Sequence, residues 1–359
     1  MDEKKVILVT GVADYWGAEV AAGLIANGHD STESGGYHVI GVDVDPLQDE
    51  IDGLDFILTD ISNPLFVELL KSENVHTVCH LNFNQSYYRS EKAFDVNVLG
   101  TMKVIGACAE ASVKKIILKS STMVYGANWN NPAFLREEFP IQGSKSYGYT
   151  RDLVEIESFC AGFCQQKPDL LITTLRFPNI IGPLSDTPFN QYLKLSVIPV
   201  LFGFDPRMQM ILETDVVRAI IHAVEHDVPG AYNVAAEGVL PLHGLIGRAG
   251  KVPFPVFHPF AYMATEIINA SRLHLIQSLP IEWDYLRYTW VADITRMREI
   301  MKFKPLYTAD ESLRDFNRCQ KLNRFSDDDP GLATDIRYMQ DLIEQRSRQK
   351  DLEDQKSKE

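Results

Sequence analysis

The sequence predicts an α/β fold in which a doubly wound parallel sheet is followed by a smaller C-terminal lobe. Short β-branched runs alternate with longer segments of helical period through about Arg176, which is typical of parallel strands joined by helices. Beyond Asn179 this alternation ends and prolines occur at positions 183, 188, 199 and 206, so a less regular region begins there. With 359 residues, 45% of them hydrophobic, the chain can bury a large core.

The elements of the sheet follow in chain order. The first run, 5–10, reads KVILVT and is predicted to be a strand, and residues 15–26 after it have helical spacing. A polar insert at 28–36 is expected to be an exposed loop. Further strands are expected at 37–42, 54–58, 76–81, 115–119 and 170–176, and further helices at 63–71, 90–111 and 147–163. Residues 213–233 are expected to return the chain to the sheet.

The same alternation sets the predicted domain boundaries. The first domain covers residues 1–178, and the chain returns to it at about 213–235. The C-terminal lobe covers 179–212 and 236–325, and a charged tail covers 326–359. We expect the tail to be a solvated helix or disordered. The apolar stretch 252–281 is broken by charged residues and histidines, so we interpret it as an amphipathic helix packed on the core and not as a membrane span.

Composition excludes several classes of function. The net charge of −14 and a pI near 5.1 argue against a nucleic-acid-binding surface, because a polyanion would be repelled. The chain passes from charged residues directly into a strand, so no secretory signal is visible and a cytoplasmic protein is expected. His222 and His226 have helical spacing but no acid beside the first histidine, so no metal site is expected. The cysteines lack a CxxC spacing and are expected to be buried and reduced; they are Cys79, Cys108, Cys160, Cys164 and Cys319.

A glycine-rich turn between the first strand and the following helix predicts a dinucleotide site. It runs from Thr10 to Gly17 and reads TGVADYWG, and its backbone N–H groups and the helix N-terminus can hold a pyrophosphate. The expected contacts are Gly11, Asp14, Tyr15, Trp16 and Gly17. Asp43 closes the second strand, where a carboxylate accepts the ribose hydroxyls of NAD and repels the 2′-phosphate of NADP. It lies further beyond the loop than the usual spacing of about 20 residues, and the insert at 28–36 accounts for the excess.

These residues resemble the extended short-chain dehydrogenase/reductase superfamily, in particular its NAD-dependent sugar-nucleotide epimerase/dehydratase branch and the UDP-glucose 4-epimerase-like proteins within it. The branch carries the loop TGxxGxxG, and here Asp14 replaces the middle glycine, which should weaken pyrophosphate binding. The resemblance covers about residues 5–316. It implies a Rossmann domain that binds NAD and a C-terminal lobe that binds substrate. It also implies cofactor contacts at Asp60, Ile61, Leu81, Asn82, Asn97 and Phe177.

The resemblance extends to a catalytic set. Ser121 lies within KSSTMVYG after the fifth strand, at the edge where such sheets bind ligands, and Tyr147 opens the next helix four residues before Arg151. The family uses serine or threonine, tyrosine and lysine in this arrangement: the tyrosine removes the hydroxyl proton and the cation stabilises its phenolate. Ser121, Tyr147 and Arg151 are therefore the predicted catalytic residues, and the last two are also predicted to contact the cofactor. Arginine keeps the charge of the expected lysine but is bulkier and planar, so the two are not interchangeable.

Substrate contacts are predicted from the same resemblance. The run from Leu175 to Pro183 resembles the family's LRxxNxxGP, in which the asparagine touches the sugar nucleotide, so Asn179 is predicted to bind substrate. Arg207 could reach a diphosphate, and Ser121 and Thr122 are predicted to contact the sugar. The family's 4,6-dehydratases carry an Asp-Glu pair where this chain has Thr122-Met123, so dehydration is not expected.

The leading interpretation is an NAD-dependent epimerase of a nucleotide-diphospho-sugar, which takes a hydride from the sugar and returns it to the other face. Two alternatives stay open. One is a net NAD-dependent oxidoreductase on a hydroxy or keto substrate. The other is a non-catalytic dinucleotide-binding scaffold, in which Asp14 and Arg151 are substitutions that abolished catalysis. The expected partner is a nucleotide-sugar or another small molecule, with no nucleic acid and no membrane. The family often dimerises through the two helices placed here at 90–111 and 147–163, so a homodimer is expected.

Overall fold

The computed structural model of the chain describes residues 4–30, 36–84, 90–145, 147–195, 197–263 and 279–323. The chain forms two compact units, Met1–Leu313 and Arg314–Glu359, and the sheet belongs to the first. The tail predicted at 326–359 lies outside the described residues, as do residues 264–278 of the predicted amphipathic helix. Among the helices of the described ranges, none is both long and apolar enough to cross a membrane.

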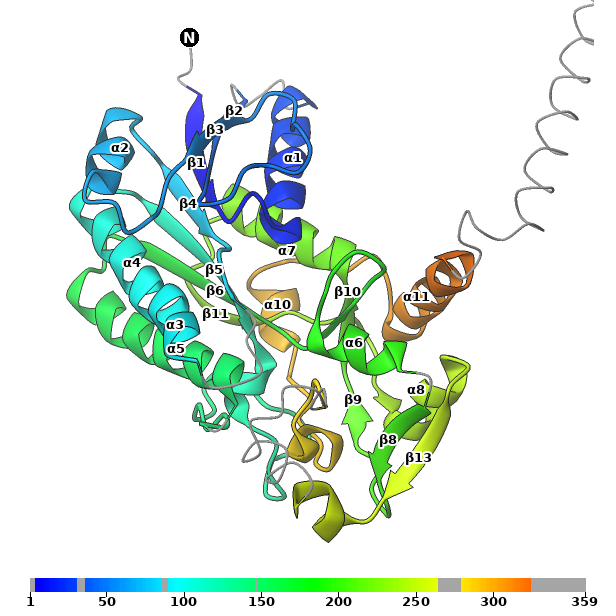
Figure 1. The fold of residues 1–359 in the computed structure, drawn as a ribbon. Helices are drawn as coiled ribbons and strands as arrows, with labels where there is room; N and C mark the ends of the chain where they lie inside the picture. The colour runs from blue at the N-terminus through cyan, green and yellow to red at the C-terminus, as the bar shows by residue number, and fades with distance from the viewer. Residues whose placement is uncertain are drawn as a thin grey trace, which may run out of the picture. The chain divides into compact units, whose positions relative to one another are not determined.

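The core of the first unit is a seven-stranded sheet (Figure 1). Its strands are β1 (Lys5–Thr10), β2 (Tyr37–Asp43), β3 (Asp55–Leu58), β4 (Thr77–His80), β5 (Lys115–Ser121), β6 (Leu171–Phe177) and β11 (Gly230–Asn233). They lie in the order β11-β6-β5-β4-β1-β2-β3, and every neighbouring pair is parallel. The order reverses between β1 and β4, which is the doubly wound arrangement of a Rossmann sheet. The predicted fold class is confirmed.

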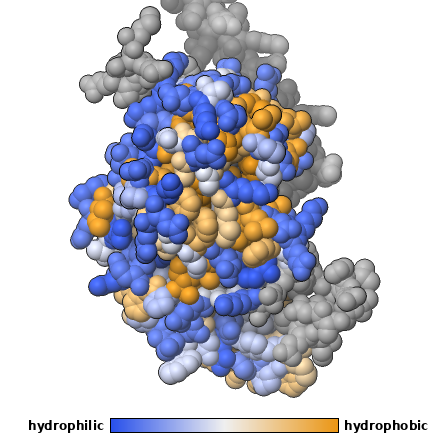
Figure 2. All heavy atoms as spheres, turned by 90° about the vertical axis from the view of Figure 1, so that its left-hand side faces the viewer, coloured by the Kyte–Doolittle hydropathy of each residue, from blue (hydrophilic) through white to orange (hydrophobic). Residues whose placement is uncertain are grey.

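Helices cover both faces of this sheet (Figure 1). One face carries α1 (Tyr15–Asp30) and α7 (Glu213–Glu225), and the other carries α2 (Phe66–Ser72), α4 (Gly100–Glu110) and α5 (Gly148–Gln166). Figure 2 shows the molecule from the side of α2, α4 and α5, where apolar atoms gather inside a hydrophilic border.

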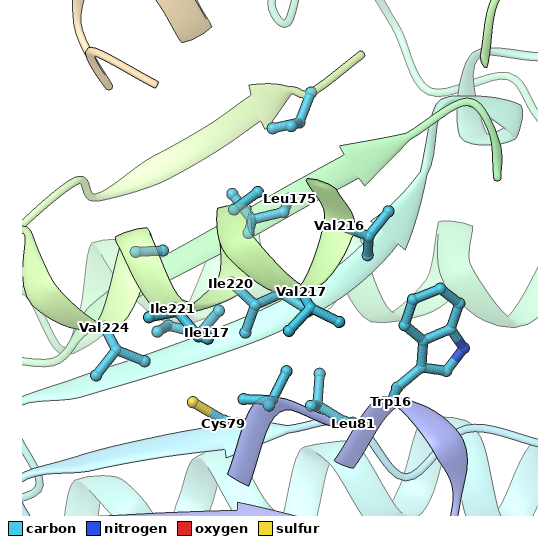
Figure 3. Packing of buried hydrophobic residues seen from close by; sticks show 14 of the residues in the cluster. Trp16, Cys79, Leu81, Ile117, Leu175, Val216, Val217, Ile220, Ile221 and Val224 are labelled. Carbon is cyan, nitrogen blue, oxygen red and sulfur yellow. The ribbon is translucent and has the colours of Figure 1, made fainter. Parts of the chain in front are cut away.

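The packing of α7 on the sheet shows why this face is buried. Its apolar residues recur at helical spacing and form one stripe; they are Val216, Val217, Ile220, Ile221 and Val224. The stripe packs on Ile117 of β5, Leu175 of β6 and Cys79 of β4 (Figure 3). Trp16, at the start of α1, lies at the edge of this cluster, where the sheet ends and the candidate site begins.

Three elements differ from the expectation. The helix predicted at 90–111 is interrupted, because α3 (Glu91–Phe94) passes into a π-helical turn, η1 (Asp95–Leu99), before α4 begins. Hydrophobic period cannot reveal such an insertion of one residue per turn. The insert predicted at 28–36 is helical at its start, because α1 continues to Asp30. The amphipathic helix predicted from 252 starts instead as strand β13 (Val252–Val256), in which two prolines oppose a helix; it pairs with β8 (Val197–Leu201).

Between β6 and α7 the chain makes an excursion from the sheet. It leaves through β7 (Asn179–Ile181) and returns through β10 (Met210–Leu212), and these two strands pair in parallel. The excursion contains α6 (Pro188–Lys194), β8 and β9 (Arg207–Met208), and β9 pairs with β12 (Leu240–Pro241). The remaining elements are the 3-10 turns η2 (Thr122–Tyr125) and η3 (Trp283–Leu286) and the helices α8 (Leu242–Arg248), α10 (Thr295–Glu299) and α11 (Ala309–Asn323). The boundaries between a nucleotide-binding domain and a substrate lobe stay a prediction.

Candidate active site

A tight turn joins β1 to α1 and places the N-terminus of the helix at the edge of the sheet. Gly11 has a φ of +78°, which L side chains rarely adopt, and a Cβ there would lie 2.9 Å from the backbone of Asn82. A Cβ on Gly17 would lie 2.0 Å from the carbonyl oxygen of Gly11, so the turn and the helix are in direct backbone contact. Only glycine fits at either position. The resulting turn at a helix N-terminus is the arrangement that binds a pyrophosphate.

A wide cleft of about 880 Å³ runs along this turn and past the ends of the neighbouring strands. Seven of the residues predicted to bind the cofactor line it: Asp14, Tyr15, Trp16, Asp60, Ile61, Leu81 and Asn82. Val44 and Leu99 add apolar surface suited to a planar base, and Lys92 and Lys103 add exposed cations suited to phosphate. The lining of the cleft therefore fits a dinucleotide in size and in chemistry.

Two aspartates lie at the turn. Asp43 is buried, and its carboxylate accepts hydrogen bonds from the N–H groups of Ala13 (2.9 Å), Val44 (2.7 Å) and Asp45 (3.1 Å). Few lone pairs are left for a ribose, and its contact with NAD stays a prediction. At Asp14, desolvation and then the charges of Asp43 and Asp45 raise the pKa of the carboxyl.

Within the described ranges, no three His, Cys, Asp or Glu side chains are grouped to hold a metal ion.

Asn97 supports the wall of the cleft from behind. It is 1% exposed, its amide donates to the carbonyl of Asn84 (2.9 Å) and to Asp152 Oδ2 (3.0 Å), and its Oδ1 accepts from the N–H of Asn84 (2.7 Å). The π-helical turn η1 presents this side chain to both partners. Asn97 thus joins α5 to the loop after β4, which carries Leu81 and Asn82 into the cleft. Its direct contact with the cofactor stays a prediction.

A narrow cavity of about 40 Å³ opens beyond the end of β5. Three of the predicted residues, Ser121, Phe177 and Asn179, line it. The Ser121 hydroxyl accepts from the N–H of Met123 (3.2 Å), and the Asn179 amide donates to the carbonyl of Gln209 (2.9 Å), so both side chains are held at the wall. The rest of the wall is largely apolar and aromatic, and it includes Met123, Tyr149, Pro178, Phe189, Ile281, Tyr285 and Trp290.

Two predicted substrate residues lie elsewhere. Thr122 is fully buried in the 3-10 turn η2, and its Oγ1 has no hydrogen-bond partner among the described residues. Arg207 lies on β9 with its side chain exposed, and its backbone N–H donates to Thr289 Oγ1 (3.3 Å). Neither residue lines the cleft or the cavity. The turn η2 directs the first inward, and the pairing of β9 with β12 holds the second at the surface.

The tyrosine and the arginine of the predicted catalytic set are engaged in other contacts. Tyr147 immediately precedes α5, is buried, and donates its hydroxyl proton to the carbonyl of Pro280 (2.7 Å). Arg151 donates through Nε (2.8 Å) and Nη2 (2.6 Å) to Asp152 Oδ1, and its guanidinium carbon lies 4.8 Å from the ring centroid of Phe94. Neither side chain lines the cleft or the cavity. Their catalytic roles stay predictions, and each needs a different side-chain arrangement to meet a substrate.

A buried polar network fixes the ends of β5 and β6 beside the cavity. Arg176 Nη2 lies 2.6 Å from Glu157 Oε2, and the Ser120 hydroxyl donates to Glu157 Oε1 (2.5 Å). The Tyr125 hydroxyl accepts from Arg176 Nη1 (2.6 Å) and donates to Asn233 Oδ1 (2.7 Å). Burial raises the pKa of Tyr125 to about 12 against the opposing charge of Arg176, so this hydroxyl stays protonated. Since donors and acceptors are matched, the network holds both strand ends in one geometry.

Lys119, which was not predicted as a site residue, lines both the cleft and the cavity. The side chain is 5% exposed, its Nζ lies 4.8 Å from the ring centroid of Trp16, and desolvation lowers its pKa to about 8. The signal was present in the sequence: Lys119 is a lysine inside a strand whose residues are all buried, two positions before Ser121 and hence on the same face of β5.

Comparison with known proteins assigns these features to a family. The chain matches the NAD dependent epimerase/dehydratase family over residues 7–235. It is 31% identical over 331 residues to an uncharacterized protein of Mycobacterium tuberculosis, an alignment that covers 90% of this chain and 86% of that protein. It is 26% identical over 183 residues to the UDP-glucose 4-epimerase of Dictyostelium discoideum, which covers 49% of this chain and 52% of that enzyme.

Solved structures share the fold. A UDP-glucose 4-epimerase of Thermotoga maritima with UDP-glucose superimposes with a TM-score of 0.66 at 21% identity, over 89% of this chain and 99% of that one. A UDP-glucuronic acid 4-epimerase of Bacillus cereus in complex with NAD gives 0.64 at 19% identity, over 88% and 96% of the two chains. The resemblance inferred from the motifs is confirmed, and with it NAD as the cofactor that the family uses. The chain belongs to the NAD dependent epimerase/dehydratase family.

Proposed function

We propose that this protein is an NAD-dependent epimerase of a nucleotide-diphospho-sugar, which removes a hydride from the sugar ring and returns it to the opposite face. The observation that carries the proposal is the meeting of two spaces at Lys119: the cleft along the glycine turn and the cavity beyond β5. Hydride transfer needs cofactor and sugar in contact, and the site must hold the oxidised sugar between the two transfers. The apolar and aromatic wall of the cavity suits that purpose once the cavity widens to admit the sugar.

Each residue has a role in this proposal. NAD, when bound in the cleft, supplies the acceptor and then the donor of the hydride. The hydroxyl of Ser121, held at the cavity wall, donates a hydrogen bond to the reacting sugar oxygen, and Asn179 binds the substrate beside it. Tyr147, by resemblance to the family, takes the hydroxyl proton as a phenolate, after its side chain has left the carbonyl of Pro280 and has released its own proton to solvent.

The wall next to Ser121 supports epimerisation over elimination of water. Elimination needs an acid and a base beside the sugar ring. Thr122 is turned into the core, and Met123, which lines the cavity, has no titratable group. Among the described residues of the wall there is no carboxylate.

The test is turnover of nucleotide sugars by the purified protein. We expect the protein to carry bound NAD and to interconvert UDP-glucose and UDP-galactose, or a related pair of UDP-sugars, without added cofactor. Products are separated by anion-exchange chromatography and identified by NMR. A protein that is fully loaded with NAD and interconverts no pair in a panel of UDP-, dTDP- and GDP-sugars contradicts the proposal.

The apolar character of the cavity favours a second candidate, the net oxidoreductase. No arginine lines its described wall, although arginine is the usual partner of a diphosphate. Such an enzyme would exchange cofactor in each cycle, so stoichiometric formation of NADH distinguishes it from an epimerase.

The engaged side chains of Tyr147 and Arg151 favour the third candidate, the non-catalytic scaffold. An inactive wild type that gains activity with Asp14→Gly and Arg151→Lys together would support it.

We also propose that the protein forms a homodimer through α4 and α5. The apolar atoms in Figure 2 lie on the side of the molecule that carries these helices. Gly106 on α4 and Gly162 on α5 are exposed, and a Cβ on either would have no described neighbour within 4 Å, so both helices present flat outer surfaces. Sedimentation analysis should give a dimer for the wild type and a monomer for Gly106→Arg. A monomeric wild type at micromolar concentration contradicts this proposal.

A further inference from the structure

Lys119 is a buried ammonium without an acidic partner among the described residues. It is 5% exposed, and its ammonium lies 4.8 Å from the centroid of the Trp16 ring. Desolvation alone lowers its pKa to about 8, so the acids that line the cleft do not offset the burial; they are Asp14, Asp45, Asp60, Asp95 and Asp186.

A second lysine on the same face of β5 shows what a structural lysine looks like here. Lys115 is 2% exposed, but its Nζ lies 2.6 Å from Asp227 Oδ1 and donates to the backbone carbonyls of Ala223, Val224 and His226. Its charge is fully compensated. Burying a charge without such partners is costly, so Lys119 calls for an explanation other than packing.

The position of Lys119 supplies that explanation. Of the described residues, Lys119 alone lines both the cleft and the cavity. Trp16 lies on its cleft side, and Ser121, two residues further along the same face of β5, lies on its cavity side. If the cofactor occupies the cleft and the sugar the cavity, the hydride crosses where these spaces meet. Lys119 lies between these spaces, with its ammonium 4.8 Å from the centroid of the Trp16 ring.

The charge that the family resemblance assigns to residue 151 is used elsewhere. Both donating nitrogens of Arg151 point to the carboxylate of Asp152, and the guanidinium stacks on Phe94. Arg151 lines neither space. Among the described residues that line the cavity, Lys119 is the one cation.

We propose that Lys119 is a catalytic cation: its ammonium contacts the reacting sugar oxygen and stabilises the negative charge that gathers there during hydride transfer. This inference rests on the proposed NAD-dependent reaction. The C–H bond breaks with both electrons leaving as the hydride, the hydroxyl proton passes to the proposed base Tyr147, and Lys119 keeps its own protons. The return transfer reverses each step. A fixed cation in a site that excludes water stabilises such a charge more strongly than solvent does.

Three variants test the proposal in the full-length protein with its cofactor. Lys119→Met removes the charge at similar length, Lys119→Arg keeps it, and Lys114→Met is a matched control that removes an exposed lysine directly before β5, outside both the cleft and the cavity. We expect kcat to fall about 100-fold in Lys119→Met, with KM changed only a few-fold, and to stay within about threefold in Lys114→Met. Wild-type activity should fall as the pH rises through about 8, the pKa of Lys119, and Lys119→Arg should lack that limb. Unchanged kcat in Lys119→Met, or wild-type activity that rises through this pH, overturns the proposal.

A binding measurement separates the failure of this proposal from the failure of the proposed function. A cation at the meeting point opposes the positively charged oxidised nicotinamide more than the neutral reduced ring. In competition titrations followed by NADH fluorescence, the preference for NADH over NAD⁺ should fall about tenfold in Lys119→Met, equivalent to about 1.4 kcal/mol, and stay within threefold in Lys114→Met. If the preference falls but no nucleotide sugar is turned over, the epimerase function fails and the placement of Lys119 stands. If the preference is unchanged, Lys119 is not at the reacting centre.

Discussion

The Glu157→Gln substitution measures how strongly the buried ion pair with Arg176 stabilises the fold around the site. The two side chains are 4% and 5% exposed, and the carboxylate accepts from Arg176 Nε (2.9 Å), from Arg176 Nη2 (2.6 Å) and from the Ser120 hydroxyl (2.5 Å). Glutamine has the same shape but no charge, and its amide nitrogen would face the donors of the guanidinium. Breaking such a pair leaves one charge buried and uncompensated, which costs about 3 to 5 kcal/mol.

This cost can be measured by thermal and urea unfolding. For a chain of this size, about 2 °C per kcal/mol converts it to a fall in Tm of about 6 to 10 °C. Glu155→Gln, on the exposed side of the same helix, is the control and should change the free energy of unfolding by less than about 0.5 kcal/mol. The double variant Glu157→Leu/Arg176→Met leaves no unpaired charge and should regain part of the loss. If Glu157→Gln unfolds within about 1 kcal/mol of the wild type, the reasoning is refuted.

Three further outcomes are expected. Asp14→Asn should tighten NAD binding about tenfold in calorimetric titrations, because it removes an anion beside the pyrophosphate. The affinity of the wild type for NAD should rise as the pH falls through the raised pKa of Asp14, and the variant should lose this pH dependence. Gly17→Ala should yield protein with less than about a tenth of the bound nucleotide, since its Cβ would lie 2.0 Å from a backbone oxygen of the turn; normal nucleotide content would contradict this. His80 is buried between Thr10 and Thr101, and desolvation lowers its pKa to about 4, so the imidazole is uncharged in the folded protein. The free energy of unfolding, measured with urea, should therefore be highest above about pH 6.5 and lower by up to about 3 kcal/mol near pH 4. His80→Gln should diminish this loss.

Most of the sheet could be predicted from the sequence, because a parallel strand buried on both faces is a continuous apolar run. The run at 5–10 is of this kind. The strand expected at 170–176 also contains Thr173, Thr174 and Arg176, and the structure begins and ends both strands within one residue of the expectation. The π-helical turn at Asp95–Leu99 could not be predicted, since its cause is a set of hydrogen bonds from Asn97 to Asn84 and Asp152. Those partners are distant in the sequence and meet only in the folded chain.

The candidate site divides in the same way. The glycine turn, Ser121 and Asn179 could be found because their signals are short motifs at strand ends, and the structure brings all three to the cleft or the cavity. The contacts of Tyr147 could not be found, because its partner Pro280 lies 133 residues away in the sequence. Lys119 shows the most informative failure. Its residue type was visible in the strand, but its position between two spaces exists only in the folded chain.

The pairing of β7 with β10 has a consequence for how substrate preference can change. The chain leaves the sheet at Asn179 and re-enters beside it at Met210, so the segment between them is a loop closed at its base. The closure entropy of such a loop rises by only about 0.6 kcal/mol for each doubling of its length. Thr187, Pro188 and Phe189, which lie on this loop, also line the cavity. The segment between β7 and β10 can therefore be lengthened, shortened or replaced as a unit. Its changes can alter substrate specificity, in evolution or by engineering, while the structure of the central sheet stays the same.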